Sequence, residues 1–214
     1  MQSITLAPAH VHSIASIAVA TTKESVTPIL EHVQIEVTAG ALTAIATDRY
    51  RVVRVQFDLP ADEKTGEVAN LEPVAIPATL LVAFSKALKA AKVTPALAVT
   101  LTVEGSRVTL AHLSGVQLAG DLSAANFPPV DRLIDGYKPG DVRDVILKPA
   151  FVADAAKFML PSDPTPAAAK DAGWNMQFSD ASKDKPGPVL LTRSEEGAGT
   201  GHIQYMLQPN LKLS

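Results

Sequence analysis

The chain contains no cysteine, which excludes a disulfide framework, thiolate metal sites and a cysteine nucleophile. It also lacks any apolar run near the roughly 20 residues that a membrane span requires. The N-terminus has no basic start followed by a continuous apolar core, the pattern that is typical of an export signal. We therefore expect a soluble, unexported cytoplasmic protein that makes no contact with a membrane.

Positive charge is in short supply. Lysine and arginine number 19 against 22 aspartates and glutamates, and the net charge is −3. A globally basic nucleic-acid binder is thereby excluded, so any contact with nucleic acid must be concentrated on one face. Charged residues make up only 19% of the 214 residues and hydrophobic residues 47%, which is far from the composition of a disordered chain. The length allows one large or two small domains.

An internal repeat organises the sequence. A short β-like run, the motif Pro-Ala-x-Val/Leu and an apolar helical stretch occur three times, beginning at Pro8, Pro77 and Pro149. The three motifs are spaced about 70 residues apart. Each proline suits the first turn of a helix, where its missing N–H would have no intrahelical partner.

Antiparallel strands are expected after each helix, because apolar and polar residues alternate there as in half-buried strands. The sequence thus predicts an α+β fold of repeated β-α-β-β-β units, with the helices on one face of antiparallel sheets. We place two units at 1–70 and 71–137, which form one domain (1–137), and a third unit at 138–214. Linkers are expected at 61–70 and 135–141. The expected strands are 4–6, 33–38, 41–46, 50–57, 74–76, 98–103, 107–111, 115–120, 145–147, 174–178, 189–192 and 202–207.

The second helix carries an uncompensated basic face. Its apolar residues fall on one side at helical spacing, and its lysines on the other. No acidic residue occurs between Pro77 and Lys92. A solvated lysine face is the simpler interpretation. A shared basic surface is the alternative, because equivalent helices of a repeat line one side of a sheet, and Lys23 and Lys157 extend the basic character to the other units. The expected apolar face is Leu80, Leu81, Phe84, Leu88 and Ala91, and the basic face is Lys86, Lys89 and Lys92.

Catalytic and metal-binding patterns are sparse. The five histidines are scattered, and no His-x3-His or cysteine pair supplies convergent ligands, so we expect neither a metal nor another cofactor. The glycine-rich stretch 197–201 has no following helix or lysine, which favours a hairpin turn over a phosphate loop. Asp48 precedes Arg49-Tyr50-Arg51, a spacing that suits acid-base work but is more typical of a turn cap paired with a nearby arginine.

Four segments resemble one family in order along the chain. The segment from Ala41 to Val53, with its Ala46-Thr47-Asp48-Arg49-Tyr50-Arg51-Val52 core, is similar to the Ala-Thr-Asp-Gly-His-Arg-Leu pattern of the bacterial replicative sliding clamp, the β subunit of DNA polymerase III. The segment 27–33 resembles the Pro-Ile-Leu run of that family, 125–130 its Asp-Phe-Pro crossing segment, and 205–211 its Met-Pro-Met-Arg-Leu ending. The resemblance spans nearly the whole chain and implies a shortened, phage- or virus-like version of the clamp.

The resemblance implies a non-enzymatic processivity factor with a DNA-clamp fold. Such a protein encircles duplex DNA without reading its sequence, and tethers DNA polymerase and the clamp loader through a short hydrophobic peptide. A bacterial cell, or a bacterium infected by a phage, would be its setting. The implied DNA-facing residues are Lys23, Lys86, Lys89, Lys92 and Lys157. The implied lining of the peptide pocket is Thr47, Tyr50, Arg51, Val52, Met206, Leu207 and Pro209.

Two departures from the family pattern affect assembly and partner choice. Arg49 and Tyr50 replace the usual Gly and His, and Asn210-Leu211 replaces Met-Arg, so we expect a different partner specificity. The family carries six units per chain and twelve per ring, whereas three are counted here. We therefore expect a homo-oligomer of four chains, or of three if the third unit is larger than its pattern indicates.

Two other classes of function fit the sequence less well. One is a clamp-like interaction or decoy module that binds clamp partners without enclosing DNA. The other is a small hydrolase that uses Asp48 with a histidine, for which these groups would have to lie within hydrogen-bond reach in a pocket.

The oligomeric state provides the first test. A ring joins sheet edges that would otherwise be open templates for pairing. Light scattering should therefore give a closed oligomer of four chains, or else of three. The measurement needs tens of micromolar protein, roughly the concentration at which weak subunit contacts form. A strictly monomeric protein at that concentration would count against the ring.

Overall fold

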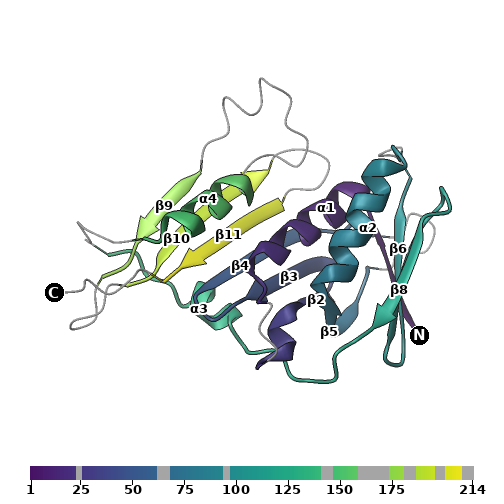
Figure 1. Ribbon diagram of the computed structural model, residues 1–214, viewed down its shortest axis with the longest axis horizontal. Helices are drawn as coiled ribbons and strands as arrows, with labels where there is room; N and C mark the ends of the chain where they lie inside the picture. Colours follow the sequence, from purple (N-terminus) through teal and green to yellow (C-terminus); the bar gives the residue numbers. More distant parts are fainter. Residues whose placement is uncertain are drawn as a thin grey trace.

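Two antiparallel sheets pack against a pair of neighbouring helices, as the ribbon in Figure 1 shows. The computed structural model describes residues 1–22, 26–61, 68–93, 97–140, 147–158, 174–180, 187–195 and 201–208. One main core joins the inner faces of the two sheets to α1 and α2, and Phe84 on α2 is completely buried in it.

The first two units have the predicted β-α-β-β-β order. The first contains β1 (Gln2–Leu6), α1 (Pro8–Ser16), the 3₁₀ turns η1 (Ile17–Ala20) and η2 (Pro28–Glu31), β2 (His32–Thr38), β3 (Ala41–Thr47) and β4 (Arg51–Asp58). The second contains β5 (Leu71–Pro77), α2 (Ala78–Ala90), β6 (Val99–Glu104), β7 (Arg107–His112) and β8 (Gln117–Asp121).

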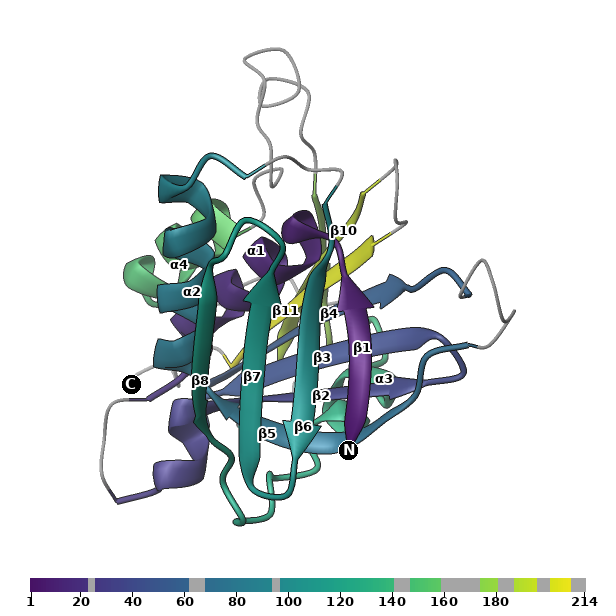
Figure 2. The same cartoon turned by 90° about the vertical axis from the view of Figure 1, so that its right-hand side faces the viewer.

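These two units exchange their first strands. β1 pairs with β6 of the second unit, with Leu6 opposite Val99, and β5 pairs with β2 of the first unit, with Ile76 opposite Val33. The four-stranded sheet, in the order β1-β6-β7-β8, faces the viewer in Figure 2. Because each sheet contains strands of both units, neither unit completes its own sheet.

The third unit extends the other sheet. It contains α4 (Pro149–Phe158), β9 (Asn175–Phe178), β10 (Val189–Glu195) and β11 (Gly201–Leu207). β11 pairs with β4, with Met206 opposite Val52, which gives a seven-stranded sheet in the order β5-β2-β3-β4-β11-β10-β9. The strand expected at 145–147 falls largely outside the described residues, as do the glycine-rich turn at 197–201, apart from Gly201, and most of the linker at 61–70.

The helix starts agree with the proline motif, with one difference. Pro8 and Pro149 are the first residues of α1 and α4, whereas Pro77 ends β5 and α2 begins at Ala78. The expected apolar face of α2 is correct at Leu81, Phe84 and Leu88 but wrong at Ala91, which lies beyond the last helical residue and is exposed.

A short helix, α3 (Asp131–Asp135), lies outside the predicted repeat. It packs under the seven-stranded sheet, on the face opposite α1, α2 and α4 (Figure 1). Ile134 packs there with Val52 and Met206, and Arg54 Nη1 lies 2.6 Å from Asp135 Oδ1. Five residues are too few to show helical periodicity, so no pattern indicated this helix.

His10 gives the fold a predictable dependence on pH. Its ring is buried and stacks on Phe57 with 4.8 Å between centroids, and burial lowers its pKa below the ordinary value of about 6.5. The unfolded chain therefore binds this proton more readily than the fold does. The stability contributed by neutral His10 should be complete above about pH 6.5 and should decline as pH falls toward the lower folded pKa. The free energy of unfolding in urea, measured for wild type and His10→Asn between pH 5 and 8, tests this. The same dependence of that free energy on pH in both proteins would contradict it.

Candidate functional site

The turn between β3 and β4 is built by its own side chains. Asp48 Oδ1 accepts the backbone N–H groups of Tyr50 and Arg51 at 3.1 and 3.0 Å. Thr47 Oγ1 accepts the N–H of Arg49 at 3.2 Å and donates to the carbonyl of Arg51 at 2.8 Å. Arg49 adopts a left-handed conformation, with φ 78°. These bonds fix the turn that carries the clamp-like Ala-Thr-Asp motif.

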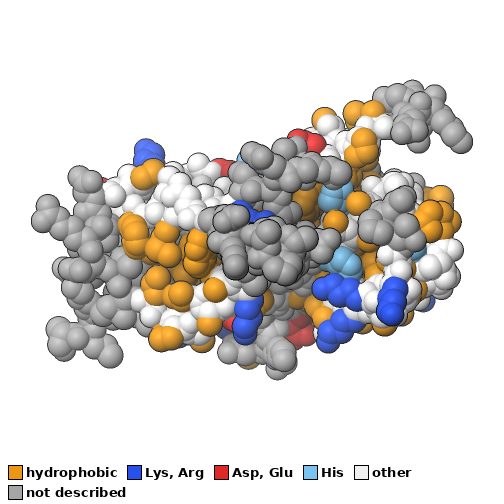
Figure 3. Space-filling model, turned by 90° about the horizontal axis from the view of Figure 1, so that it is seen from above, with side chains coloured by type: hydrophobic (Ala, Val, Ile, Leu, Met, Phe, Trp, Pro, Cys, Tyr) orange, Lys and Arg blue, Asp and Glu red, His pale blue; other side chains and the backbone are white. Residues whose placement is uncertain are grey.

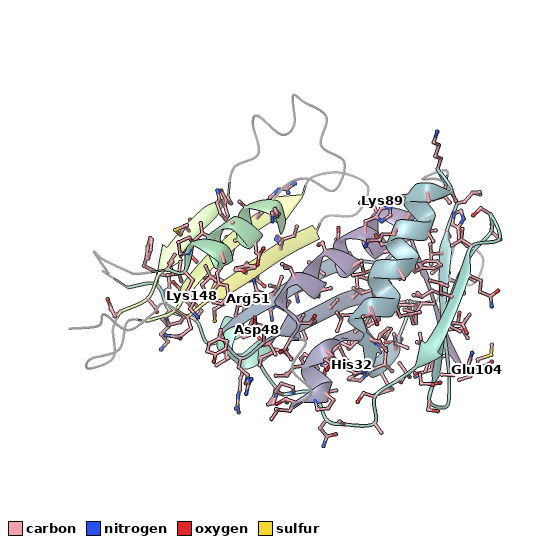
Figure 4. All side chains as sticks on the ribbon, viewed as in Figure 1. His32, Asp48, Arg51, Lys89, Glu104 and Lys148 are labelled. Atoms are coloured by element: carbon pink, nitrogen blue, oxygen red, sulfur yellow. The ribbon has the colours of Figure 1, made fainter. Side chains whose placement is uncertain are left out.

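Arg51 connects this turn to the third unit. Its Nε lies 2.8 Å from Asp48 Oδ2, and its Nη1 lies 2.7 Å from Asp154 Oδ2 on α4. Nη1 also donates to Tyr205 Oη on β11 at 3.1 Å, and the guanidinium lies 4.7 Å from the centre of the Phe151 ring. The labelled Asp48 and Arg51 lie near the junction of the units in Figure 4.

The electrostatics of this cluster favour charged Arg51. Burial alone would lower the pKa of Arg51, but the hydrogen bonds with Asp154, Tyr205 and Asp48 outweigh it and raise the pKa. Burial also raises the pKa of the Tyr205 phenol, although the Arg51 hydrogen bond opposes this shift. The cluster thus holds a permanent cation between two carboxylates and a neutral phenol.

Asp48 has the structural role that its spacing favoured. Both of its carboxylate oxygens are engaged by the turn and by Arg51, and no hydrogen bond joins it to a described histidine. His12 instead contacts Ser85, and His112 contacts Ser114. The geometry required by the hydrolase hypothesis is absent from these residues. Within the described part of the chain, no three His, Asp or Glu side chains are close enough to hold a metal ion.

The residues expected to line one peptide pocket are divided between the two faces of the sheet. Val52 and Met206 point to the α3 side, where they form a buried cluster with Ile45, Leu190 and Ile134. Leu207 points to the helix side and belongs to the main core. The other four are Thr47, which is buried, Tyr50, which is exposed, Arg51, which belongs to the ion cluster, and Pro209, which lies outside the described residues.

A hollow of about 320 Å³ adjoins the cluster around Val52 and Met206. Tyr137 belongs to both features, since it packs against the cluster and also borders the hollow. Leu133 on α3 borders the hollow as well, and 51% of its surface is exposed. The remaining lining residues are Gly136, Lys138, Pro139, Ser179, Asp180 and Pro188. No sequence pattern indicated this hollow, because it depends on how α3 packs.

The basic residues are exposed on the side formed by the helices. Lys86 and Lys89 lie on α2, Lys92 follows in the turn after it, and Lys157 lies near the end of α4. Burial, with a smaller contribution from the charge of Lys89, lowers the pKa of nearby His12. In Figure 3, Lys and Arg side chains gather at one end of the molecule beside histidines, and Lys89 is labelled in Figure 4. Lys23 lies outside the described residues.

The helical segments contain almost no acidic residues to offset these lysines. Asp154 is the only acidic residue in α1, α2 and α4, and its carboxylate is paired with Arg51. The helix side is therefore locally basic, although the chain as a whole is acidic. No helix of the described segments has the length and apolar character of a membrane span.

Comparisons with known proteins find similarity in the fold alone. Neither a family model nor a curated protein sequence matches the chain. Among solved structures, the DNA polymerase sliding clamp of Bacillus subtilis is 16% identical, with a TM-score of 0.71 over 98% of this chain and 64% of the clamp. The DNA polymerase III β subunit of Thermotoga maritima is 15% identical, with a TM-score of 0.71 over 100% of this chain and 66% of that one.

A third match has the same quality. The sliding clamp of Pseudomonas aeruginosa is 12% identical, with a TM-score of 0.71 over 97% of this chain and 65% of the clamp. The chain thus spans slightly less than two thirds of the length of these clamps. It has the sliding-clamp fold, and the expectation of an α+β clamp architecture is confirmed.

The buried ion cluster can be tested by unfolding. Arg51→Met keeps the aliphatic stem but leaves Asp48 and Asp154 without their cation, and it should lower the free energy of unfolding by about 3 kcal/mol. Arg107→Met is the matched control, because Arg107 and Asp121 form an exposed pair at 3.8 Å that should contribute less than about 0.5 kcal/mol. Urea denaturation measures both variants, and similar small losses would show that the cluster does not stabilise the fold.

Proposed function

We propose that this protein is a DNA sliding clamp, a non-enzymatic processivity factor that encircles duplex DNA as a homo-oligomeric ring and tethers a polymerase. The main support is the combination of the clamp fold with a lysine-bearing helix side whose single carboxylate is already paired. The clamp fold is the framework on which the proposal rests, and the charge distribution favours the helix side as the one that would meet the DNA.

The chemistry of the helix side suits sliding better than sequence recognition. Lysine ammonium groups attract phosphates through exchangeable counterions, and such contacts carry no information about the bases. Alanine predominates among the exposed residues between the lysines, as at Ala83, Ala90 and Ala153. These small side chains offer no hydrogen bonds to base edges, so the duplex would be held without being fixed in register.

The ring would be closed through sheet edges. β8 and β9 each end a sheet among the described strands, although the Phe178 carbonyl on β9 also accepts the Gly140 N–H at 2.7 Å. The last strand of a sheet has backbone groups without a ladder partner on its outer side. Pairing such edges between chains removes them. We propose four chains as the preferred ring and three as the second choice.

The lysine side is tested by Lys86→Ala, Lys89→Ala and Lys92→Ala combined. These exposed residues should affect stability by less than about 0.5 kcal/mol each. Duplex binding should weaken, and the slope of log affinity against log salt should fall by roughly 0.9 for each phosphate that the variant no longer neutralises. Polymerase processivity should fall in parallel.

The matched control removes three exposed cations elsewhere, by Arg107→Ala, Arg132→Ala and Lys138→Ala. Fluorescence anisotropy on duplex DNA at several salt concentrations should show nearly normal binding for this variant. Equal effects of the two triple variants would mean that net charge, and not the helix side, governs binding.

The partner peptide would dock from the α3 side of the sheet, with polymerase and clamp loader as the partners. Val52 and Met206 are covered there by Ile134, so the accessible part of the site is the neighbouring hollow between Leu133 and Tyr137. An apolar side chain entering this hollow would exclude water from Leu133. Burial of one such side chain contributes roughly 1.5 to 3 kcal/mol, which suits a contact that a polymerase must release.

Leu133→Glu should therefore weaken binding of a short hydrophobic clamp-binding peptide by about tenfold or more. Leu113→Glu is the control, because Leu113 is a more exposed leucine, at 79%, in the turn after β7. Calorimetry measures both affinities. Unchanged binding by Leu133→Glu would place the peptide site elsewhere, for example toward Tyr50.

A further inference from the structure

Helices α1 and α2 provide an internal template for how two units combine. The first, fourth, seventh and eighth residues of each helix are buried, and the two helices lie side by side (Figure 1). A hydrogen bond of 2.8 Å between His12 Nδ1 and Ser85 Oγ joins the fifth residue of α1 to the eighth residue of α2. The equivalent buried positions are Pro8, Val11, Ile14 and Ala15 on α1, and Ala78, Leu81, Phe84 and Ser85 on α2.

Helix α4 begins in the same way but lacks this cover. The Val152 N–H donates to the Lys148 carbonyl at 3.3 Å, as the Val11 N–H donates to the Ala7 carbonyl at 3.3 Å. The two helices therefore start alike, and their residues can be compared position by position from Pro8 and Pro149. At the four equivalent positions of α4, Pro149 and Ala156 are exposed, Val152 is half-buried and only Ala155 is buried. The positions that are buried in the common core on α1 and α2 are therefore more exposed on α4.

The sheet shows the same open side. β9 is the first strand after α4, as β2 is the first strand after α1. β2 is flanked by β3 and by β5, which comes from the companion unit. In the described part of the chain β9 pairs with one strand, β10, and its Phe178 carbonyl also accepts the Gly140 N–H at 2.7 Å. Trp174, which precedes β9, and Met176 on β9 are each 38% exposed. In Figure 3, hydrophobic side chains gather over the α4 end of the molecule.

We propose that α4 and β9 form one half of a clamp domain that a second copy of this chain completes, with α4 packed against α4 across a two-fold axis. The two described units that could cover α4 already cover each other, and the open face has the register of that contact. A two-fold interface requires a self-complementary surface. The template contact joins the fifth and eighth residues, which on α4 are Ala153 and Ala156, two small side chains that let helices approach closely.

This composite domain rests on the proposed function for its place in a ring. Four chains would supply four domains made of the first two units and two domains made of paired third units. The free β8 edges would make the second kind of joint. Two different two-fold joints then alternate around the ring, and Lys157 from each of two chains would lie beside the α4 joint on the DNA side.

The absence of native cysteine makes this joint directly testable. A single Ala156→Cys substitution places one thiol near the proposed axis, so a short bismaleimide should link two chains into a covalent dimer on a denaturing gel. Ala83→Cys is the control, because Ala83 is an equally small exposed residue on α2, away from the proposed joint. Cross-linking of Ala156→Cys no greater than that of Ala83→Cys would overturn the proposal.

Solution mass provides a second readout. Ala156→Arg should break the α4 joint and at least halve the oligomer mass with an unchanged circular dichroism spectrum, whereas Ala83→Arg should keep the wild-type mass. A closed ring that retains its mass in Ala156→Arg and is not linked at Ala156→Cys would overturn the composite domain and leave the clamp function standing. Dimers linked at Ala156→Cys that do not retain DNA would support the joint and count against the clamp function.

Discussion

The Arg51 guanidinium lies where the β3–β4 turn, α4 and β11 meet, and the junction of the third unit with the first depends on it. Asp48 and Asp154 approach it from separate elements, and the Tyr205 hydroxyl completes the set. Without the cation, two carboxylates would face each other beside a buried phenol. A planar guanidinium can serve three partners in fixed directions, which a lysine ammonium cannot do equally well. The pairing of β4 with β11 and the position of α4 on the sheet are therefore coupled to one charge.

The same ion pair also affects the charge of the surface that the helices form. Asp154, the only carboxylate on the three longer helices, is held by Arg51, so the lysines of α2 and α4 have no acidic partner on those helices. On the opposite face, Arg54 pairs with Asp135 and helps to hold α3 over the cluster around Val52 and Met206. Two arginines three residues apart on β4 thus stabilise opposite faces of one sheet.

The sequence was informative where local chemistry dominates. Ala39 and Gly40 form the turn between the strands expected at 33–38 and 41–46, and both have positive φ. Gly40, with φ 82°, suits this turn because a Cβ added there would lie only 3.3 Å from the Leu59 carbonyl oxygen. Alternation located the strands of the described residues, and the proline motif located α1, α2 and α4. The register of β4 against β11, the helix α3 and the division of Met206 and Leu207 between two faces depend on contacts between distant segments. No local pattern encodes these contacts, which is why the sequence could not show that Met206 and Leu207 face opposite sides of the sheet.

The exchange of first strands also constrains how the chain can fold. Leu6 finds its β-sheet partner only at Val99, more than 90 positions later, so β1 cannot pair while the first unit emerges from the ribosome. Contacts at such sequence separation require loop closure before they contribute stability, which slows folding. Until β6 has been synthesised, β1 and the buried side of α1 remain exposed to wrong partners. A nascent chain of this kind therefore exposes apolar surface that can aggregate until its second unit has been made.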